Sequence, residues 1–274
     1  MFDSIAGDYD SLNHILSLDV DKIWRKKALK QIVDAPAPAR VLDLACGTGD
    51  FSIAIAKALS RSHKRVVTPI EAHAKASVKA PVEAPAKAPV EAQVTSTGFV
   101  TGDSGRSDLM TKGHVTGVDL SEGMLAVMRE KVAKAGLTEM ISIEEGDGEN
   151  LRFPDNTFDR VTIAFGIRNF EDRPKGLREM LRVLKPGGRL VILELSRPEN
   201  KVIRWFYDLY FLHILPKVGG KVSGDKAAYA YLPASVAAFP GKKEFSATMR
   251  KAGFRTVTHK AFTLGICRMY TGEK

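Results

Sequence analysis

The ten residues from Val41 to Asp50, Val-Leu-Asp-Leu-Ala-Cys-Gly-Thr-Gly-Asp, constrain the fold of this chain more than any other stretch. A short apolar run enters a glycine-containing turn, and apolar residues at helical spacing follow it. This order is typical of a buried strand, a tight turn and a helix that packs back on the strand. Gly47 and Gly49 lack Cβ atoms, so the backbone can bend sharply there and approach a ligand closely.

The spacing of this turn excludes two common kinds of phosphate site. A dinucleotide-binding turn would have a third glycine where Ser52 stands, and a phosphate loop would continue with Gly-Lys-Ser/Thr. The carboxylate of Asp43 would repel a phosphate but attract a cation. We therefore predict a small, positively charged cofactor at Asp43, Gly47, Thr48 and Gly49. S-adenosylmethionine, which carries a sulfonium and an α-amino group, fits that description.

Composition narrows the class of protein. With 274 residues, 44% of them hydrophobic, the chain is expected to form a single α/β domain over residues 1–274. Its two cysteines, Cys46 and Cys267, give neither a disulfide framework nor the spacing of metal ligands, which indicates a cytoplasmic protein without a metal site. The sequence has no apolar leader and no run of about eighteen apolar residues, so we expect neither export nor a membrane span.

The formal net charge of +9 raises the question of an anionic partner. No long basic run is interleaved with aromatic residues, so the sequence favours lysines scattered on solvated helices and predicts no nucleic-acid partner. A weak attraction to an anionic membrane surface remains an expectation.

Strand and helix patterns alternate along the chain. Residues 1–34 are predicted to form an N-terminal cap with an amphipathic helix from about Asp19. Residues 61–113, with Lys-Ala-Pro-Val-Glu-Ala-Pro repeats, are predicted to be a disordered, low-complexity insertion. Strand patterns follow at 114–119, 140–145, 158–165 and 190–195, and a helix closed by Lys185-Pro186-Gly187-Gly188 precedes the last of them. A helix at 242–252 and an antiparallel hairpin should complete the sheet.

This alternation predicts a doubly wound, mostly parallel sheet, in which ligands bind outside the carboxyl ends of the strands. Asp119 and Asp147 each end a strand, and we predict that they bind the ribose hydroxyls and the adenine amine of the cofactor. The alternatives are a helix N-cap or surface acid for Asp119 and a plain turn aspartate for Asp147. The insertion enters and leaves at the opposite edge of the sheet and should hang away from the site. The predicted cofactor-binding residues are Asp43, Gly47, Thr48, Gly49, Asp119, Leu120, Asp147, Gly148 and Ala164.

Distinctive short stretches occur along nearly the whole chain outside the insertion. They are Phe2-Asp3-Ser4-Ile5-Ala6, Tyr9-Asp10, Leu12-Asn13, Trp24-Arg25-Lys26, Leu42 to Asp50, Phe153-Pro154-Asp155-Asn156-Thr157-Phe158-Asp159, Ala164-Phe165-Gly166-Ile167-Arg168-Asn169, Arg182-Val183-Leu184-Lys185-Pro186-Gly187-Gly188-Arg189 and Phe239-Pro240. With them the chain resembles the class I S-adenosylmethionine-dependent methyltransferases and, more narrowly, the UbiE/MenG family of menaquinone and ubiquinone C-methyltransferases. The chain departs from that family in Gly148, where alanine is more usual, and in the insertion.

The resemblance implies a Rossmann-like, seven-stranded sheet and methyl transfer to a ring carbon of a reduced prenylated quinone. Conversion of demethylmenaquinol to menaquinol is the expected reaction, and a benzoquinol of ubiquinone synthesis or another lipid phenol is the alternative acceptor. Two alternatives come from other functional classes: a cofactor-binding protein that has lost catalysis, and an RNA methyltransferase. The acidic strand ends disfavour the former, and the absence of a basic, aromatic groove disfavours the latter.

In such a reaction the sulfonium is already a strong electrophile, so the main task of the protein is positioning. Arg168, with Asn169 beside it, is the expected partner of the phenolate that develops on the acceptor. Its alternative is a structural ion pair with Glu171 or Asp172. Tyr9, on the N-terminal cap, is expected to hydrogen-bond the second oxygen of the acceptor, and a water is the expected base.

Residues 197–240 are predicted to form a helical segment on the substrate side. Its aromatic part, 202–216, is expected either to line a tunnel for a polyprenyl tail and touch the membrane surface, or simply to pack as a cap helix. His14 and His213 are alternative bases, each of which also has a structural interpretation. The sequence leaves a homodimer open.

Overall fold

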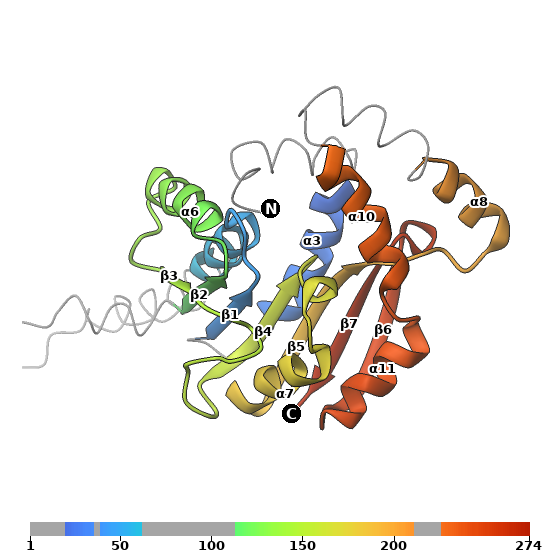
Figure 1. The fold of residues 1–274 in the computed structure, drawn as a ribbon. Coiled ribbons are helices and arrows are strands. Elements are labelled where there is room, and N and C mark those ends of the chain that lie inside the picture. The colour runs from blue at the N-terminus through green and yellow to red at the C-terminus, as the bar shows by residue number, and fades with distance from the viewer. Residues whose placement is uncertain (1–19, 36–38, 62–112, 211–225) are drawn as a thin grey trace, which may run out of the picture.

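The chain forms one mixed sheet with helices on both faces (Figure 1). The computed structural model describes residues 20–35, 39–61, 113–210 and 226–274. Within these residues, seven strands are hydrogen-bonded in the order β3-β2-β1-β4-β5-β7-β6. Strands β1 to β5 pair in parallel, whereas β7 is antiparallel to both β5 and β6. The strands are β1 Arg40–Leu44, β2 His114–Asp119, β3 Ile141–Glu145, β4 Phe158–Ala164, β5 Leu184–Leu195, β6 Arg255–Phe262 and β7 Cys267–Glu273. The predicted doubly wound, mostly parallel sheet with a terminal antiparallel hairpin is confirmed.

Each face of the sheet carries its own apolar core, because successive side chains of a strand point to opposite faces. Val41 packs in the core that includes residues of α3, of the helix at 50–61 and of α6, whereas Leu42 packs in the core that includes residues of α7 and α11. Side-chain caps begin several helices: Ser121 accepts the Met124 N–H at the start of α6, and Asp172 accepts the Lys175 N–H at the start of α7. The helices are α3 Val20–Ile32, 50–61, α6 Glu122–Lys134, η1 Ile167–Asn169, α7 Arg173–Val183, α8 Lys201–Leu209, α10 Lys226–Ala238, α11 Lys242–Lys251 and η3 Thr263–Gly265.

The boundary predicted at Lys185-Pro186-Gly187-Gly188 is wrong. Helix α7 ends at Val183 and β5 begins at once with Leu184, so the proline and glycines belong to the strand rather than to a helix stop. The C-terminal residue explains this, because the Lys274 N–H donates to the Gly188 carbonyl over 3.0 Å. Gly187, with a φ of 74°, allows the backbone of β5 to bend next to the C-terminal residue.

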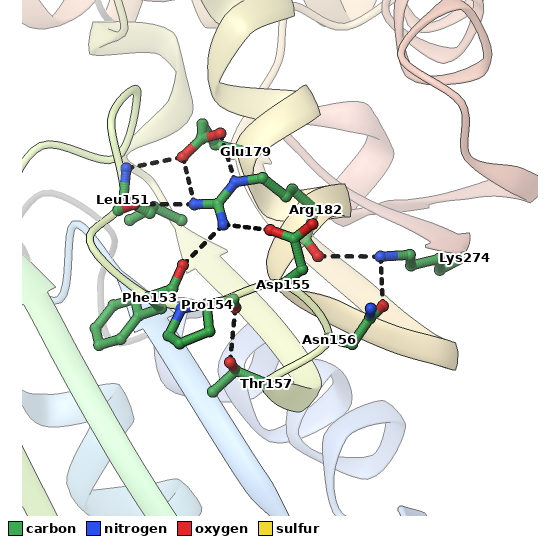
Figure 2. A network of polar contacts seen from close by, with 9 residues as sticks. All are labelled: Leu151, Phe153, Pro154, Asp155, Asn156, Thr157, Glu179, Arg182 and Lys274. Atoms are coloured by element: carbon green, nitrogen blue, oxygen red, sulfur yellow. Dashed lines mark hydrogen bonds and ion pairs between the residues drawn. The ribbon is translucent and has the colours of Figure 1, made fainter.

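The stretch Phe153 to Asp159, one of the family-like motifs, is fixed by a single arginine of α7 (Figure 2). Arg182 donates to the carbonyls of Leu151 and Phe153 and forms ion pairs with Asp155 and Glu179, all at 2.8 to 2.9 Å. A guanidinium can bind several acceptors in its plane, which a lysine cannot do. Arg182 therefore holds the loop before β4 in place, and the motif contributes to the fold rather than to the site.

Several predictions lie outside the described residues. They concern Tyr9 and the cap before Val20, the body of the insertion, and residues 211–225, which include His213. The flanks of the insertion are described: a Cβ on Gly113 would lie 3.4 Å from Leu59, near the end of the helix at 50–61. His114 pairs with Arg40, the first residue of β1, so both flanks lie at the amino ends of the strands. This agrees with the predicted edge, opposite to the site. Within the described ranges, no helix is both long and apolar enough to cross a membrane.

Candidate functional site

A cavity of about 470 Å³ opens where β1, β4 and β5 end and is also lined by α3 and α8. Of the predicted site residues, Asp43, Gly47, Thr48, Ala164 and Arg168 line it. Its lining further includes Val20, Asp21, Trp24, Arg25, Ala45, Cys46, Asp50, Phe51, Phe165, Leu195, Ile203, Phe206, Tyr207, Tyr210, Leu232, Thr263, Leu264 and Ile266. Gly49, Asp119, Leu120, Asp147, Gly148 and Asn169 do not line this cavity.

Among the described residues, Asp43 is a buried carboxylate with a single hydrogen bond to offset its loss of hydration. It lies in β1, is 1% exposed and accepts a hydrogen bond of 2.5 Å from the Ser52 hydroxyl. Burial raises its pKa to about 7, although the Ser52 hydrogen bond and the charge of Arg25 act in the opposite direction. Desolvation of a carboxylate disfavours its charged form, so a cation that entered the cavity would restore the lost stabilisation.

The glycine turn is packed against α6. Gly47 has a φ of 54° and Gly49 a φ of 82°, the left-handed region in which a side chain is strained. A Cβ on Gly49 would also collide with the side chain of Met128. Thr48 is buried and accepts a hydrogen bond of 3.3 Å from Lys131 of the same helix. The turn is therefore a rigid backbone cradle rather than a loose loop.

Asp119 holds this turn from the neighbouring strand. Its two carboxylate oxygens accept the N–H groups of Gly47 at 2.8 Å and of Ser121 at 2.9 Å. Leu120, the next residue, is 68% exposed. The structure thus brings Asp119 to the glycine turn, as the strand order predicts, and adds an organising function that sequence reasoning did not propose. Its ribose contact remains a prediction.

Asp147 and Gly148 have a local explanation. Asp147 is exposed and its carboxylate accepts the N–H of Glu149 at 2.8 Å, which is the geometry of a turn aspartate. A Cβ on Gly148 would lie 2.6 Å from the ring of Phe170, so packing alone requires glycine here. The prediction that Gly148 makes room for adenine therefore has a competing physical reason, and the adenine contact of Asp147 stays a prediction.

Among the residues that line the cavity, two that directly follow strands of the sheet adopt positive φ angles without being glycine. They are Ala45, with a φ of 48°, and Phe165, with a φ of 64°, directly after β1 and β4. A Cβ on Gly166 would collide with that of Ala45, so the two turns are in contact. Phe165 also lies under the guanidinium of Arg25, 5.7 Å from its ring centre. Such backbone strain persists only where the surroundings enforce it, and it is concentrated at functional sites.

Arg168 is held by a buried acid. Its Nη1 donates to Glu194 at 3.0 Å and also to the carbonyl of Phe165, while its Nε donates to Ser235 at 3.3 Å. Glu194, which is 0% exposed, additionally accepts the backbone N–H groups of Arg168 and Leu195. Among the described residues, Nη2 of Arg168 has no hydrogen-bond partner. The guanidinium is thus fixed on one side and keeps a donor for a ligand on the other.

The ion pair anticipated with Glu171 or Asp172 is therefore wrong, because Glu194 occupies that position. Sequence reasoning missed Glu194, although a signal was present: one acid interrupts the otherwise apolar end of β5, Leu190-Val-Ile-Leu-Glu-Leu195. Acidic residues are almost never fully buried unless they are paired. Asn169, beside Arg168, accepts a hydrogen bond of 2.9 Å from the Tyr231 hydroxyl and does not reach the cavity.

These features fit a small cationic cofactor. A buried carboxylate with one hydroxyl partner faces the same cavity as Gly47, whose lack of a side chain leaves room for a ligand. Asp43, Gly47 and Thr48 would hold the charged end of the molecule. Together with the order of the sheet, this site defines a class I methyltransferase that uses S-adenosylmethionine.

Comparisons with known proteins narrow that class. The sequence model of the ubiE/COQ5 methyltransferase family matches residues 1–274. A ubiquinone/menaquinone biosynthesis C-methyltransferase UbiE of Geobacter sulfurreducens is 43% identical over all of this chain and 87% of the relative. A demethylmenaquinone methyltransferase of Bacteroides fragilis is 38% identical over all of this chain and 91% of the relative. The chain therefore belongs to the ubiE/COQ5 methyltransferase family, which confirms the predicted family, enzyme class and methyl donor.

Solved structures agree on the fold. A SAM-dependent methyltransferase of Aquifex aeolicus matches with a TM-score of 0.52 and 19% identity, over 90% of this chain and 88% of that one. A second, from Methanococcus maripaludis, matches with a TM-score of 0.57 and 16% identity, over 100% of this chain and 94% of the other. At such identities the likeness concerns the architecture alone.

Proposed function

We propose that the protein transfers the methyl group of S-adenosylmethionine to a ring carbon of a reduced prenylated quinone, with demethylmenaquinol as the acceptor. One observation carries the proposal: a single cavity is lined by the buried acid Asp43, by the guanidinium of Arg168 and by apolar side chains of α8. The relatives named demethylmenaquinone methyltransferase support the naphthoquinol acceptor.

The residues of this chain supply orientation and charge stabilisation. When bound, the cofactor supplies an electrophilic methyl group, and the acceptor carbon becomes nucleophilic as its neighbouring hydroxyl loses a proton. Arg168 would stabilise the resulting phenolate through Nη2, because its other nitrogens are already committed. Preorganisation by Glu194 means that little rearrangement accompanies the charge development.

The proton is best accepted by a water. Glu194 is fully buried and already accepts three N–H groups, so it is a poor base. Burial raises the pKa of Tyr207, which lines the cavity, so its hydroxyl stays protonated and can only donate to an oxyanion. The role of Tyr9 beside the second acceptor oxygen stays a proposal, whereas Asn169 is turned to the Tyr231 hydroxyl and would act only by supporting Arg168.

We propose that the protein acts in the cytoplasm and contacts the inner face of the membrane through helix α8. Its residues Val202, Trp205, Phe206 and Leu209 are all exposed and recur at helical spacing, which makes one apolar face. Such a face can lie in the interfacial layer of a bilayer, where the tail of the acceptor resides. We expect the purified protein to co-float with anionic vesicles. The double variant Val202→Ser, Trp205→Ser should no longer do so. Ile23→Ser, on α3, is the matched control and should co-float normally.

The reaction is tested by the transfer of radiolabelled methyl from S-adenosylmethionine to reduced demethylmenaquinone and, in parallel, to the corresponding benzoquinol. We expect the naphthoquinol to be preferred, and a preference for the benzoquinol would place the protein in ubiquinone synthesis instead. Arg168→Lys keeps a positive charge opposite Glu194 but loses the planar fork, so turnover should fall about a hundredfold while cofactor affinity is kept. Full activity of this variant would refute the assigned role of Arg168.

A further inference from the structure

The turn between β6 and β7 has an unusual backbone. Thr263, Leu264 and Gly265 follow one another with φ angles of 44°, 58° and 94°. Only glycine adopts this region without strain, and a threonine or leucine there persists only where neighbouring contacts enforce it. Three such residues in a row at the end of a hairpin therefore need a structural cause.

Neighbouring elements provide that cause. The indole N–H of Trp24 in α3 donates to the Thr263 hydroxyl at 2.9 Å. From the end of β5, the Ser196 hydroxyl donates to the Gly265 carbonyl at 2.7 Å, and the Ser196 N–H donates to the Ile266 carbonyl at 2.8 Å. The turn is thus tied from two sides to the elements that build the cavity, and its conformation is set before any ligand binds.

This conformation presents Leu264 to the cavity. Its side chain is 72% exposed and yet lines the same cavity as Asp43 and Arg168, which are 1% and 8% exposed. The buried pair therefore lies at the floor, and Leu264 lies at the mouth. Phe206 of α8, which is 60% exposed, and Ile203 also line it. These three side chains have no hydrogen-bonding group, so they can recognise only hydrocarbon.

We propose that the Thr263–Gly265 turn is a preformed subsite for the isoprenoid tail of the acceptor, with Leu264 as its contact residue. The proposal rests on the proposed function, which places the acceptor ring at Arg168 and so directs its tail toward this mouth. It adds a specificity-determining residue on the hairpin to the apolar residues that α8 contributes. Because the strain is present in the free protein, binding pays no further ordering cost for the turn.

The test uses Leu264→Asn, because asparagine tolerates a positive φ and is similar in size but offers no hydrocarbon. Thr256→Asn is the matched control: Thr256 has a φ of 46° but is exposed on β6 and does not line the cavity. Leu264→Gly, which suits the backbone, guards against a folding failure. Steady-state methyl transfer is measured in detergent with a prenylated and a tail-free naphthoquinol, and the binding of farnesol, an isoprenoid that cannot react, is measured by calorimetry.

We expect both Leu264 variants to raise the KM of the prenylated quinol about tenfold, as for the loss of one apolar side-chain contact, with kcat and the tail-free KM unchanged. Farnesol should bind to the parent and to Thr256→Asn but about tenfold more weakly to the Leu264 variants. Equal losses with both quinols would overturn the proposal, because Leu264 would then shape the ring site. Unchanged kinetics of both Leu264 variants with the prenylated quinol in detergent would also overturn it, because the tail would then make no contact with Leu264. Farnesol binding that depends on Leu264, without methyl transfer to any quinol, would refute the proposed function and leave the subsite standing.

Discussion

Binding of the methyl donor should weaken as the pH falls below 7, because we propose that Asp43 is the acid that receives its positive charge. Burial raises the pKa of this carboxyl to about 7 in the cofactor-free protein. The cation needs the ionised carboxylate, so the apparent affinity follows the ionised fraction. That fraction is roughly nine-tenths at pH 8 and one-tenth at pH 6, so the Kd is expected to rise about tenfold over this range.

Calorimetric titration with S-adenosylmethionine at several pH values measures this slope directly. S-adenosylhomocysteine, which has the same amine but no sulfonium, is titrated in parallel, because the amine itself titrates near pH 8. Asp43→Asn is expected to bind more weakly at every pH and to lose the slope below 7. A Kd that does not change between pH 6 and pH 7.5, or a slope that survives in Asp43→Asn, would refute the reasoning.

The carboxyl of Asp43 should have the opposite pH dependence in folding: it should stabilise the cofactor-free protein at low pH rather than at high pH. Its pKa in the folded, cofactor-free protein lies above the ordinary value of 3.8, so its protonated form favours folding. The contribution is fully present below about pH 4 and is lost as the pH rises through 7. Above pH 7 the buried charge costs on the order of 4 kcal/mol. In urea unfolding without cofactor, Asp43→Asn should therefore be more stable than the parent at pH 8, and the gain should shrink at pH 5.

Other predictions concern the groups around the cofactor and the acceptor. Glu194→Gln leaves the guanidinium of Arg168 without its countercharge, so the free energy of unfolding should fall by about 3 kcal/mol in urea titrations, and turnover should fall more than cofactor affinity. Adding Arg168→Met should recover stability but not turnover, and recovery of both would contradict the role of the pair. Gly49→Ala should cost about 2 kcal/mol more than Gly136→Ala, because both glycines have positive φ but only Gly49 faces Met128.

The fold and the donor side of the site could be predicted because local patterns specify them. Strand periodicity, the glycine turn and the acids at or near the ends of β1, β2 and β3 can be recognised in short stretches of sequence, and parallel topology brings the strand ends together. Asp43, Gly47, Thr48, Ala164 and Arg168 accordingly meet at one cavity. The partners of these residues depend on register instead, and register is set by tertiary packing rather than by local sequence.

Glu194 and Leu264 show what local sequence does not specify. Glu194 reaches Arg168 only because β4 and β5 pair in parallel with Ala164 opposite Leu193. Leu264 is placed by a strained turn that Trp24 and Ser196 hold from distant elements. Nothing in the sequence Phe-Thr-Leu-Gly requires positive φ at its threonine and leucine, so this part of the acceptor site becomes visible only in three dimensions.

Two buried carboxylates near one cavity, Glu194 and Asp43, have opposite environments, and this difference supports the separate functions that we propose for them. Glu194 is compensated by a guanidinium and two further backbone N–H contacts, so its charge is already used within the protein. Asp43 has only the Ser52 hydroxyl as a hydrogen-bond donor in the described part of the chain, and burial raises its pKa to about 7. A group whose charge is left uncompensated favours an incoming cation, whereas a compensated one only orients its partner. We therefore expect donor recognition at the end of β1 and acceptor recognition at the end of β5, with the methyl transfer in the space that separates them.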